Sequence, residues 1–361
     1  MGAYEPLYFH IPEGTLLNPG PDAAVANAPH IGRLVVNSVH SVFARLLYAS
    51  GECDQCSASH GGSGCTVAFS GPNQWGAVSS DLMGFKQNPE GAGARTDLDG
   101  VDAYGFFWAN QGRAPDVEDF ESRYTFLHLS QKYRIDSCGF GRRRGGSGTY
   151  TAWMNYHVPE INALTLGNSS RIPVGGGLFG GYAANVAGNL LLRETSALGG
   201  DRRERVTRKA RVPTKWVRPR DLESLLRDRN FARHCELRPA QNPPVVLERG
   251  DVIVGMNTGG HGYGDVLERS PEDVLQDFQS DLISARTVAD IYCVVVDPRT
   301  GQVDSAATEA RRHQERAKRL KRGVSFSEFE EAWSRKRPPD SALRYFGRWP
   351  DGAPLGAVRR G

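Results

Sequence analysis

The sequence predicts an α+β fold, with a strand-rich mixed body, a long N-terminal helix and a helical C-terminal arm. Apolar residues recur every three or four positions from Ile31 to Leu47, which is typical of an amphipathic helix, and we expect one face of it to pack against the body. Alternating residues from Tyr124 onward and the apolar run at residues 252–256 indicate strands. Near the C-terminus, Ser325 and Glu328 have the spacing of a capping box, which predicts a further helix.

These elements divide the 361 residues into a body at 1–300 and a helical arm at 301–361. A basic excursion interrupts the body at residues 201–221, where Trp216 is the one aromatic residue. We interpret it as a solvated excursion or a docking surface for another subunit, because a nucleic-acid site usually combines basic with several aromatic side chains.

The overall composition excludes several classes of protein. The 44 basic and 41 acidic residues nearly cancel, so the net charge says little about partners, and a nucleic-acid site would need the basic residues clustered. No apolar run is long enough to cross a bilayer, and we expect neither nucleic acid nor membrane as a partner. The N-terminus has no basic start followed by an apolar stretch, so it is not a secretory signal. The six cysteines form no disulfide framework, which favours a reducing compartment and a cytoplasmic protein.

Residues 90–102, EGAGARTDLDGVD, are the most unusual stretch of the chain. They combine the carboxylates of Glu90, Asp97, Asp99 and Asp102 with Arg95 and several glycines, and they have no apolar period. Glycines permit close backbone approach, and carboxylates beside an arginine are paired, hydrated or placed around a cation or polar substrate. The alternative is a surface loop whose aspartates cap their own turns.

A second glycine-rich stretch, residues 136–149, contains Arg142, Arg143 and Arg144 between glycines. Guanidinium groups beside a nested backbone can hold a phosphate or carboxylate, so Asp136 and the three arginines are candidates for an anion clamp. The stretch is not a Walker A loop, because no Gly-Lys-Ser/Thr follows. The arginines can equally pair with Asp136 or with the carboxylates of residues 90–102.

Cys53, Cys56, His60 and Cys65 resemble a zinc knuckle. The spacing between Cys56 and His60 is one residue short of the usual knuckle, and the segment lacks the aromatic and basic residues of a nucleic-acid reader. The alternative interpretation is a glycine-rich loop with incidental thiols.

Four stretches in this order resemble the C-terminal half of the hydantoinase B/oxoprolinase family. They are GTLLNPGPDAAV, EGAGARTDLDGVDA, DSCGFGRRRGGSGT and GGHGYGDVLERSPEDVLQD. The phrases LFGGY and FEEAW…ALRYFGRWP make the chain most similar, within this family, to the large (alpha) subunits of the acetone and acetophenone carboxylases. The resemblance covers nearly the whole chain except the basic excursion.

The resemblance implies a subunit of a multi-subunit, ATP-dependent and biotin-independent ketone carboxylase, which joins a ketone and bicarbonate to form a 3-oxo acid. It also implies partners: a hydantoinase A-like subunit that uses ATP and, in some complexes, a small zinc-binding subunit. ATP and a divalent metal (Mn, Mg or Zn) are expected in the complex on other chains. One alternative is an ATP-dependent hydantoinase or 5-oxoprolinase subunit acting on cyclic amides, and another is a non-catalytic assembly subunit.

The family's metal motif, of the His-x-x-Asp type after an Asn-Asp-Pro turn, belongs to the N-terminal half and has no equivalent here. We therefore expect no metal ligands in this chain and a partner chain that carries the N-terminal hydantoinase B half. His261 stands where relatives tend to carry glycine.

The candidate site residues follow from these stretches. Glu90, Arg95, Asp97 and Asp99 are expected to build or brace the pocket, Asp136 with Arg142, Arg143 and Arg144 to hold an anion, and His261 with Asp265 to form a secondary loop. We expect Arg95 to support the acids structurally rather than to clamp substrate.

Overall fold

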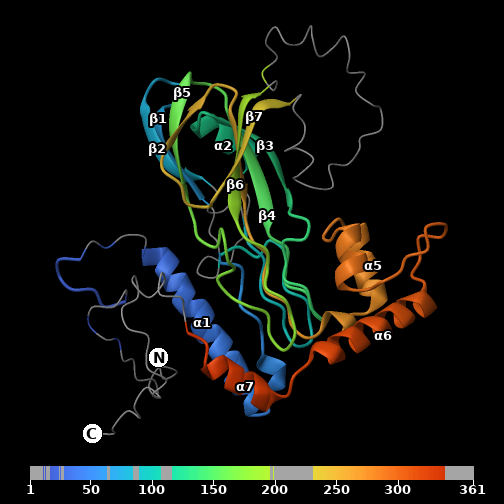
Figure 1. Cartoon of the computed structure of the whole chain (residues 1–361). Helices are drawn as coiled ribbons and strands as arrows, with labels where there is room; N and C mark the ends of the chain where they lie inside the picture. Colours follow the sequence, from blue (N-terminus) through green and yellow to red (C-terminus); the bar gives the residue numbers. More distant parts are fainter. Residues whose placement is uncertain are drawn as a thin grey trace. The chain divides into compact units, whose positions relative to one another are not determined.

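The computed structural model describes residues 11, 13, 17–23, 25, 28–62, 66–83, 89–106, 116–195, 198 and 231–337. The basic excursion at 201–221 and the segment 341–349 lie outside these residues. The chain forms two compact units, Met1–Ser305 and Ala306–Gly361, which are described separately. The predicted α+β class is confirmed, with two antiparallel sheets, a long helix near the N-terminus and helices near the C-terminus (Figure 1).

The strands of the first unit form two antiparallel sheets. The four-stranded sheet has the order β2-β1-β5-β8, with β1 (Thr66–Pro72), β2 (Val78–Met83), β5 (Glu160–Leu166) and β8 (Val245–Glu248). The five-stranded sheet has the order β3-β4-β9-β6-β7, with β3 (Phe126–Tyr133), β4 (Thr149–Asn155), β6 (Gly188–Thr195), β7 (Ala232–Arg238) and β9 (Val252–Met256). A short helix, α2 (Val117–Arg123), begins at the capping carboxylate of Asp116 and leads towards β3.

The two sheets pack face to face around one apolar core. Trp153 of β4, Ile253 of β9 and Leu191 of β6 are paired across the five-stranded sheet and face the same way. They meet residues of the other sheet, including Phe69 and Ile161. Neighbouring residues on β4, β6 and β9 point to a second buried cluster, so the central strands are apolar on both faces.

Below the sheets lies a region that we call the glycine core. It consists of extended segments, most of which have no regular secondary structure. These segments are residues 57–62, 89–106, 137–148, 175–184 and 257–264. The segments run alongside each other beneath the strands in Figure 1. The N–H groups of Gly91 and Ala94 donate to the carbonyls of Thr258 and His261, at 3.2 and 2.9 Å.

Residues 257–264 form hydrogen bonds at the same three-residue spacing with another segment of the glycine core. The N–H groups of Gly260 and Tyr263 donate to the carbonyls of Gly146 and Arg143, at 2.8 and 2.9 Å. Bonds to one neighbour every third residue are what an extended helix with three residues per turn produces. A Cβ on Gly260 would lie 1.8 Å from the Ala92 carbonyl oxygen, so only glycine permits this approach.

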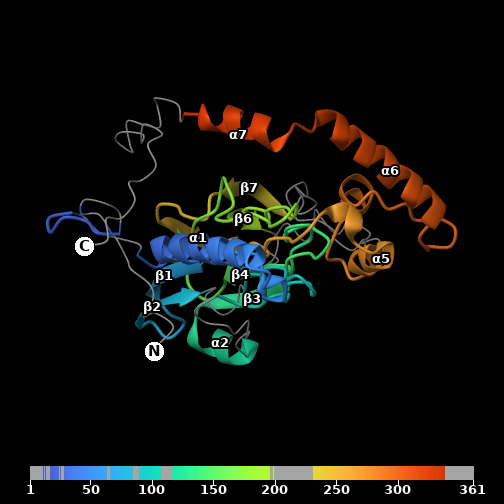
Figure 2. The ribbon, with the colours of Figure 1, turned by 90° about the horizontal axis from the view of Figure 1, so that it is seen from below.

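The long helix α1 (Ala28–Ala49) confirms the predicted element. The buried face carries Arg33, Asn37 and Ala44, whereas Val42 and Leu46 are 55% and 57% exposed. One face of the helix does pack against the body, as expected. Its contacts are polar at Arg33 and Asn37 and apolar at Ala44 and Leu47, and much of the apolar stripe stays exposed. In Figure 2, which views the molecule from below, α1 lies in front of the strands.

The first unit ends in a compact helical cluster. It consists of η3 (Val266–Glu268), α5 (Pro271–Gln279) and the π-helix η4 (Thr287–Ile291), which enclose apolar residues around Val274 and Tyr292. The Ser270 hydroxyl caps α5 by accepting from the N–H groups of Glu272 and Asp273. A short 3-10 turn, η2 (Cys53–Gln55), follows α1 earlier in the chain.

The second unit carries most of the helix α6 (Ser305–Arg322) and all of α7 (Phe326–Ser334). The predicted capping box is present, because Ser325 and Glu328 bond each other's backbone. On α7, the exposed rings of Phe329 and Trp333 stack with centroids 5.8 Å apart. Among the described residues, no helix is both long and apolar enough to span a bilayer.

Candidate functional site

Five charged side chains join the glycine core to the helical cluster. The guanidinium of Arg269 donates to both oxygens of Asp99 at 2.7 Å, and also to Asp277 at 2.7 Å. The guanidinium of Arg144 donates to Asp277 at 2.9 Å and to Asp102 at 2.8 Å. Asp277 therefore bridges two buried arginines, which bind different carboxylates of residues 90–102.

This network changes the protonation behaviour of its members. Burial alone would raise the pKa of Asp99, but the hydrogen bond and charge of Arg269 outweigh burial and lower it. Next to the network, burial raises the pKa of the Cys138 thiol to about 12, so this cysteine stays protonated. The network is consequently a fixed set of charges, in which each carboxylate already has an arginine partner.

A second buried ion pair joins α1 to the glycine core. Arg33 donates to the carboxylate of Glu90, and both side chains are enclosed. The Arg33 guanidinium also lies over the ring of Phe106, 4.9 Å from its centroid. Burial lowers the pKa of Arg33 to about 9.

His60 lies near this pair, and His40 and His261 lie near His60. His60 stacks on Tyr104 at 5.0 Å and lies edge-on to His40 at 5.7 Å. Burial is the largest cause that lowers the pKa values of His60 and His261 to about 4, and the charges of neighbouring groups act in the same direction. Both rings are therefore neutral near pH 7.

Backbone donors fix the tautomers of two of these rings. The N–H of Gly93 donates to His60 Nδ1 and the N–H of Ala184 donates to His261 Nδ1, each at 3.0 Å. Because a neutral imidazole has one proton, both rings carry it on Nε2.

The candidate residues of the sequence have different environments. Glu90 and Asp99 are enclosed in ion pairs, whereas the Arg95 and Asp97 side chains are 54% and 70% exposed and lie 4.0 Å apart. The support that we expected from Arg95 is given by Arg144 and Arg269 instead, because these arginines bond the aspartates directly.

The remaining candidates lie at backbone turns and at the edge of the helical cluster. Asp136 accepts from the N–H of Ser284 at 2.9 Å, and Asp265 caps η3 by accepting from the N–H of Leu267. The half-exposed guanidinium groups of Arg142 and Arg143 form long ion pairs of about 4 Å with Glu268 and Asp273, and Arg142 also donates to the Thr96 carbonyl at 3.4 Å. Arg144 differs from both, since it is buried and fully engaged.

Sequence reasoning missed Arg33, Asn37, Arg269 and Asp277. Asp277 follows Val274 by three residues on α5, so helical spacing placed it on the buried face. Arg33 and Asn37 form a stripe at a four-residue spacing with Ser41, although the apolar stripe of α1 is the stronger signal. No motif or spacing in the sequence around Arg269 indicates its role in the network.

The described residues do not fit a metal site. Across the parts of the chain that the structure describes, no group of three or more His, Cys, Asp or Glu side chains could hold a metal ion. Cys56 Sγ donates to the Ala44 carbonyl at 3.1 Å, and His60 Nδ1 accepts from Gly93, while Cys65 lies outside the described residues. The aspartates of the network are held by arginines.

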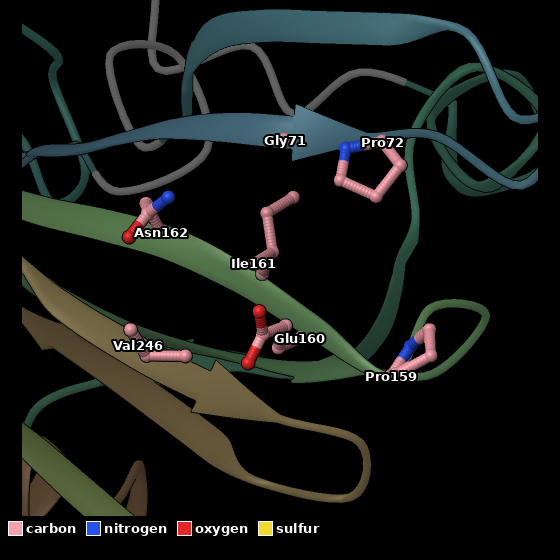
Figure 3. A pocket seen from close by; sticks show the side chains of 7 residues that line it. All are labelled: Gly71, Pro72, Pro159, Glu160, Ile161, Asn162 and Val246. Carbon is pink, nitrogen blue, oxygen red and sulfur yellow. The ribbon is translucent and has the colours of Figure 1, made fainter.

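A surface pocket of about 320 Å³ lies on the β-sandwich (Figure 3). Its lining comes from β1, β5, β8 and the residues next to them, and includes Gly71, Glu160 and Ile161. It contains none of the candidate residues. The buried ion pairs and histidines described above lie in or next to the glycine core instead.

Comparisons with known proteins agree with this architecture. The chain is 33% identical over 356 residues to the acetophenone carboxylase delta subunit of Aromatoleum aromaticum, covering 97% of this chain and 50% of that protein. It is 31% identical over 231 residues to the caprolactamase subunit beta of Pseudomonas jessenii, covering 62% of this chain and 32% of that protein. The chain thus spans half or less of the length of these relatives.

The fold is also similar to that of a solved enzyme. A nucleotide-free structure of acetone carboxylase, described in connection with ATP-dependent acetone carboxylation, superposes with a TM-score of 0.67 at 25% identity. The match covers 80% of this chain and 37% of that chain. The family model described as hydantoinase B/oxoprolinase matches residues 1–266, and the chain belongs to this family.

Proposed function

We propose that this chain is a subunit of a multi-subunit, ATP-dependent and biotin-independent ketone carboxylase of the acetone or acetophenone type. The identity to the acetophenone carboxylase delta subunit, which extends over 97% of the chain, is the observation that carries this proposal. The reaction joins the α-carbon of a ketone to the carbon of bicarbonate. An α C–H bond of the ketone and a C–O bond of bicarbonate break, the proton and the leaving hydroxide combine to water, and ATP hydrolysis supplies the driving force. A hydantoinase A-like partner would supply the ATP-dependent activation.

In this proposal the described part of the chain supplies a rigid wall. Glu90 and Asp99 brace the glycine core through Arg33 and Arg269, so neither is available as a catalytic base. Arg142 and Arg143 keep half-exposed guanidinium groups, which makes them the candidates to hold an anionic group. We propose that another chain of the complex holds its metal.

We propose a partner chain that corresponds to the region of the relatives outside the match with this chain. The relatives are about twice as long or longer, so in them further sequence accompanies the matched body. The exposed apolar face of α1, which contains Val39, Val42, Phe43 and Leu46, is a surface that such a partner would cover.

The docking proposal is tested with charged substitutions on that face. Val42→Asp combined with Leu46→Asp should abolish co-purification with the partner chain while leaving the free energy of unfolding of this chain within about 0.5 kcal/mol. Val78→Asp, at another exposed apolar position, is the matched control. Retention of the partner by the double variant would refute this surface.

The reaction is tested with the reconstituted complex. ATP consumption that requires acetone or acetophenone plus bicarbonate supports the carboxylase. The second candidate is cyclic-amide hydrolysis, which the similarity to caprolactamase favours. ATP consumption with hydantoin or 5-oxoproline, and without bicarbonate, would replace the first proposal with the second.

A third possibility is a non-catalytic assembly subunit. The partner that carries the metal motif would then retain its activity when this chain is omitted. Arg142→Ala with Arg143→Ala provides a finer test, because it should raise the KM for the anionic substrate and leave assembly unchanged if these arginines hold an anion.

A further inference from the structure

Cys53 and Cys56 have no part in the site described above, although their spacing is that of a Cys-x-x-Cys pair. Both carry free thiols, of which Cys53 is partly exposed and Cys56 is buried. Within the described part of the chain, neither belongs to a group of side chains that could hold a metal ion. The two thiols therefore retain chemistry that the proposed reaction does not use.

The turn between the two cysteines suits a disulfide. They are joined by the 3-10 turn η2, in which the N–H of Cys56 donates to the Cys53 carbonyl at 3.1 Å. In such a turn, side chains three residues apart lie on the same side, and a rise of about 2 Å per residue separates them by about 6 Å. The Cα atoms of cysteines in disulfides are most often about 5.5–6 Å apart.

The thiol of Cys56 already lies beside the peptide group that precedes Cys53. Its Sγ is 3.8 Å from the carbonyl oxygen of Glu52, whose carbon is bonded to the Cys53 nitrogen. The φ angle of Cys56 is −75°, close to that of a 3-10 helix, so its Cβ points as it would within the turn. Rotation about the two Cα–Cβ bonds can therefore bring the sulfurs together while the backbone stays in place.

Thr96 of the glycine core holds the turn at both ends. Its hydroxyl oxygen lies 2.6 Å from the carbonyl oxygen of Cys53 and 3.1 Å from that of Cys56. The N–H of Thr96 also donates to the Cys56 carbonyl, at 3.2 Å. A turn that is already fixed loses little freedom when its thiols are linked, so each thiol has a high effective concentration at the other.

The two thiols differ in access and in protonation. Cys56 Sγ donates to the Ala44 carbonyl of α1 at 3.1 Å and lies in an apolar cluster with Ala58 and Leu178. Burial raises the pKa of the Cys56 thiol, and the neighbouring Cys53 acts in the same direction. Cys53 is therefore the thiol that an external reagent meets first, and Cys56 is the thiol that can resolve the product.

We propose that Cys53 and Cys56 form a reversible disulfide by exchange with a small-molecule disulfide, and that this bond releases the thiol contact beneath α1. The Cys53 thiolate attacks one sulfur of the reagent, the S–S bond of the reagent breaks, and its first thiolate leaves. The Cys56 thiolate then attacks the Cys53 sulfur, which forms the Cys53–Cys56 bond and expels the second reagent thiolate. The two cysteine protons end on the two reagent thiols.

The effect on α1 follows from the loss of a donor. A disulfide sulfur carries no proton, so the Ala44 carbonyl loses its bond from Cys56. The sulfur also turns out of the apolar cluster beneath the helix, towards Cys53. Neither half of the proposal depends on the reaction that the assembled complex catalyses.

Glutathione exchange tests the first half. The full chain, reduced and treated with EDTA, is equilibrated near neutral pH with mixtures of oxidised and reduced glutathione, and its remaining thiols are alkylated for peptide mass analysis. The peptide with Cys53 and Cys56 should lose two hydrogens and carry no glutathione, and an excess of reduced glutathione should restore it. Cys235, exposed on β7, should carry glutathione instead. Glutathione that stays on Cys53, or a pair that stays reduced while Cys235 reacts, would overturn the proposal.

Three variants identify the bonded sulfurs. Cys56→Ser should trap glutathione on Cys53, because the resolving thiol is missing. Cys53→Ser, at the partly exposed position, should leave Cys56 unmodified, and it provides the test if the buried substitution prevents folding. Cys65→Ser is the matched control and should form the internal bond as the wild type does. A bond that persists in Cys56→Ser and disappears in Cys65→Ser would join Cys53 to Cys65 and reject the proposed pair.

Hydrogen exchange tests the second half. Amides of residues 44–49 at the end of α1 should exchange about two- to fivefold faster in the oxidised chain, because one weak hydrogen bond is lost. Amides of α5 should exchange equally in both forms, and Cys53→Ser treated with the same reagent should show no change. Equal exchange of residues 44–49 in the reduced and oxidised chain would reject the release of the contact beneath α1.

Discussion

Arg33 of α1 and Glu90 of the glycine core form an enclosed ion pair between segments that are 57 residues apart in sequence. The pair anchors α1 to the body at the polar part of its buried face. In most globular proteins apolar contacts anchor a helix in this way. Removing one member of a buried pair costs about 3–5 kcal/mol, because the remaining charge stays in a poorly solvated environment.

The first prediction concerns this pair. Glu90→Leu should lower the free energy of unfolding by about 3–5 kcal/mol, and Arg33→Met should have a similar effect. The double variant should recover much of the loss, because no isolated charge remains. Urea unfolding of the four proteins measures the coupling, and simple additivity of the two losses would contradict the interpretation.

Asp277 gives the second prediction, because it bridges Arg144 and Arg269. Asp277→Asn removes the charge that both arginines share and should cost about 3 kcal/mol. Asp273→Asn on the same helix is the matched control. Its carboxylate is half-exposed and 3.9 Å from Arg143, so its loss should cost less than about 1 kcal/mol. Equal losses in urea unfolding would show that Asp277 is not a bridge.

The sequence identified the elements of the fold better than their contacts. Apolar period located α1, and local capping signals located α5 and α7, because each depends on residues close in sequence. The orientation of α1 was not predictable in this way. Its apolar stripe is strong, but Arg33 and Asn37 find their partners in distant segments, and an apolar stripe alone does not tell a core from an interface.

The candidate site shows the same limit. Residues 90–102 were recognised as unusual, and Glu90, Asp99 and Asp102 are indeed the carboxylates that the buried arginines bind. Their partner Arg269 is 170 residues from Asp99. Such pairs follow only from the packing of the glycine segments, whose contacts have a period of three and no apolar pattern.

The third prediction tests that packing. Gly260→Ala places a methyl carbon 1.8 Å from the Ala92 carbonyl oxygen, so the backbone of two segments must separate. The cost should be about 3 kcal/mol or more. Gly176→Ala has no atom within 4 Å of the new carbon and should leave stability unchanged or slightly raised. Thermal unfolding compares the two, and a tolerated Gly260→Ala would refute close packing at this position.

The fourth prediction concerns acid stability. The pKa values of His60 and His261 lie near 4 in the folded protein, below the ordinary value of 6.5, mainly because burial disfavours the charged ring. The groups that act on these rings are His40 and Arg33 for His60, and His60 for His261, and their charges shift the pKa in the same direction. Above pH 6.5 both rings are neutral in the folded and unfolded chain, so they contribute no pH dependence there.

As the pH falls from 6.5 to 4, the unfolded chain binds protons that the folded chain does not, and stability is lost by up to about 3 kcal/mol per histidine. His261→Asn and His60→Asn keep an acceptor for the backbone N–H, and each should flatten the decline of unfolding free energy between pH 6.5 and 4. His313→Asn, on the exposed surface of α6, should leave the decline as it is. An acid profile that neither buried substitution changes would mean that other groups carry the proton uptake.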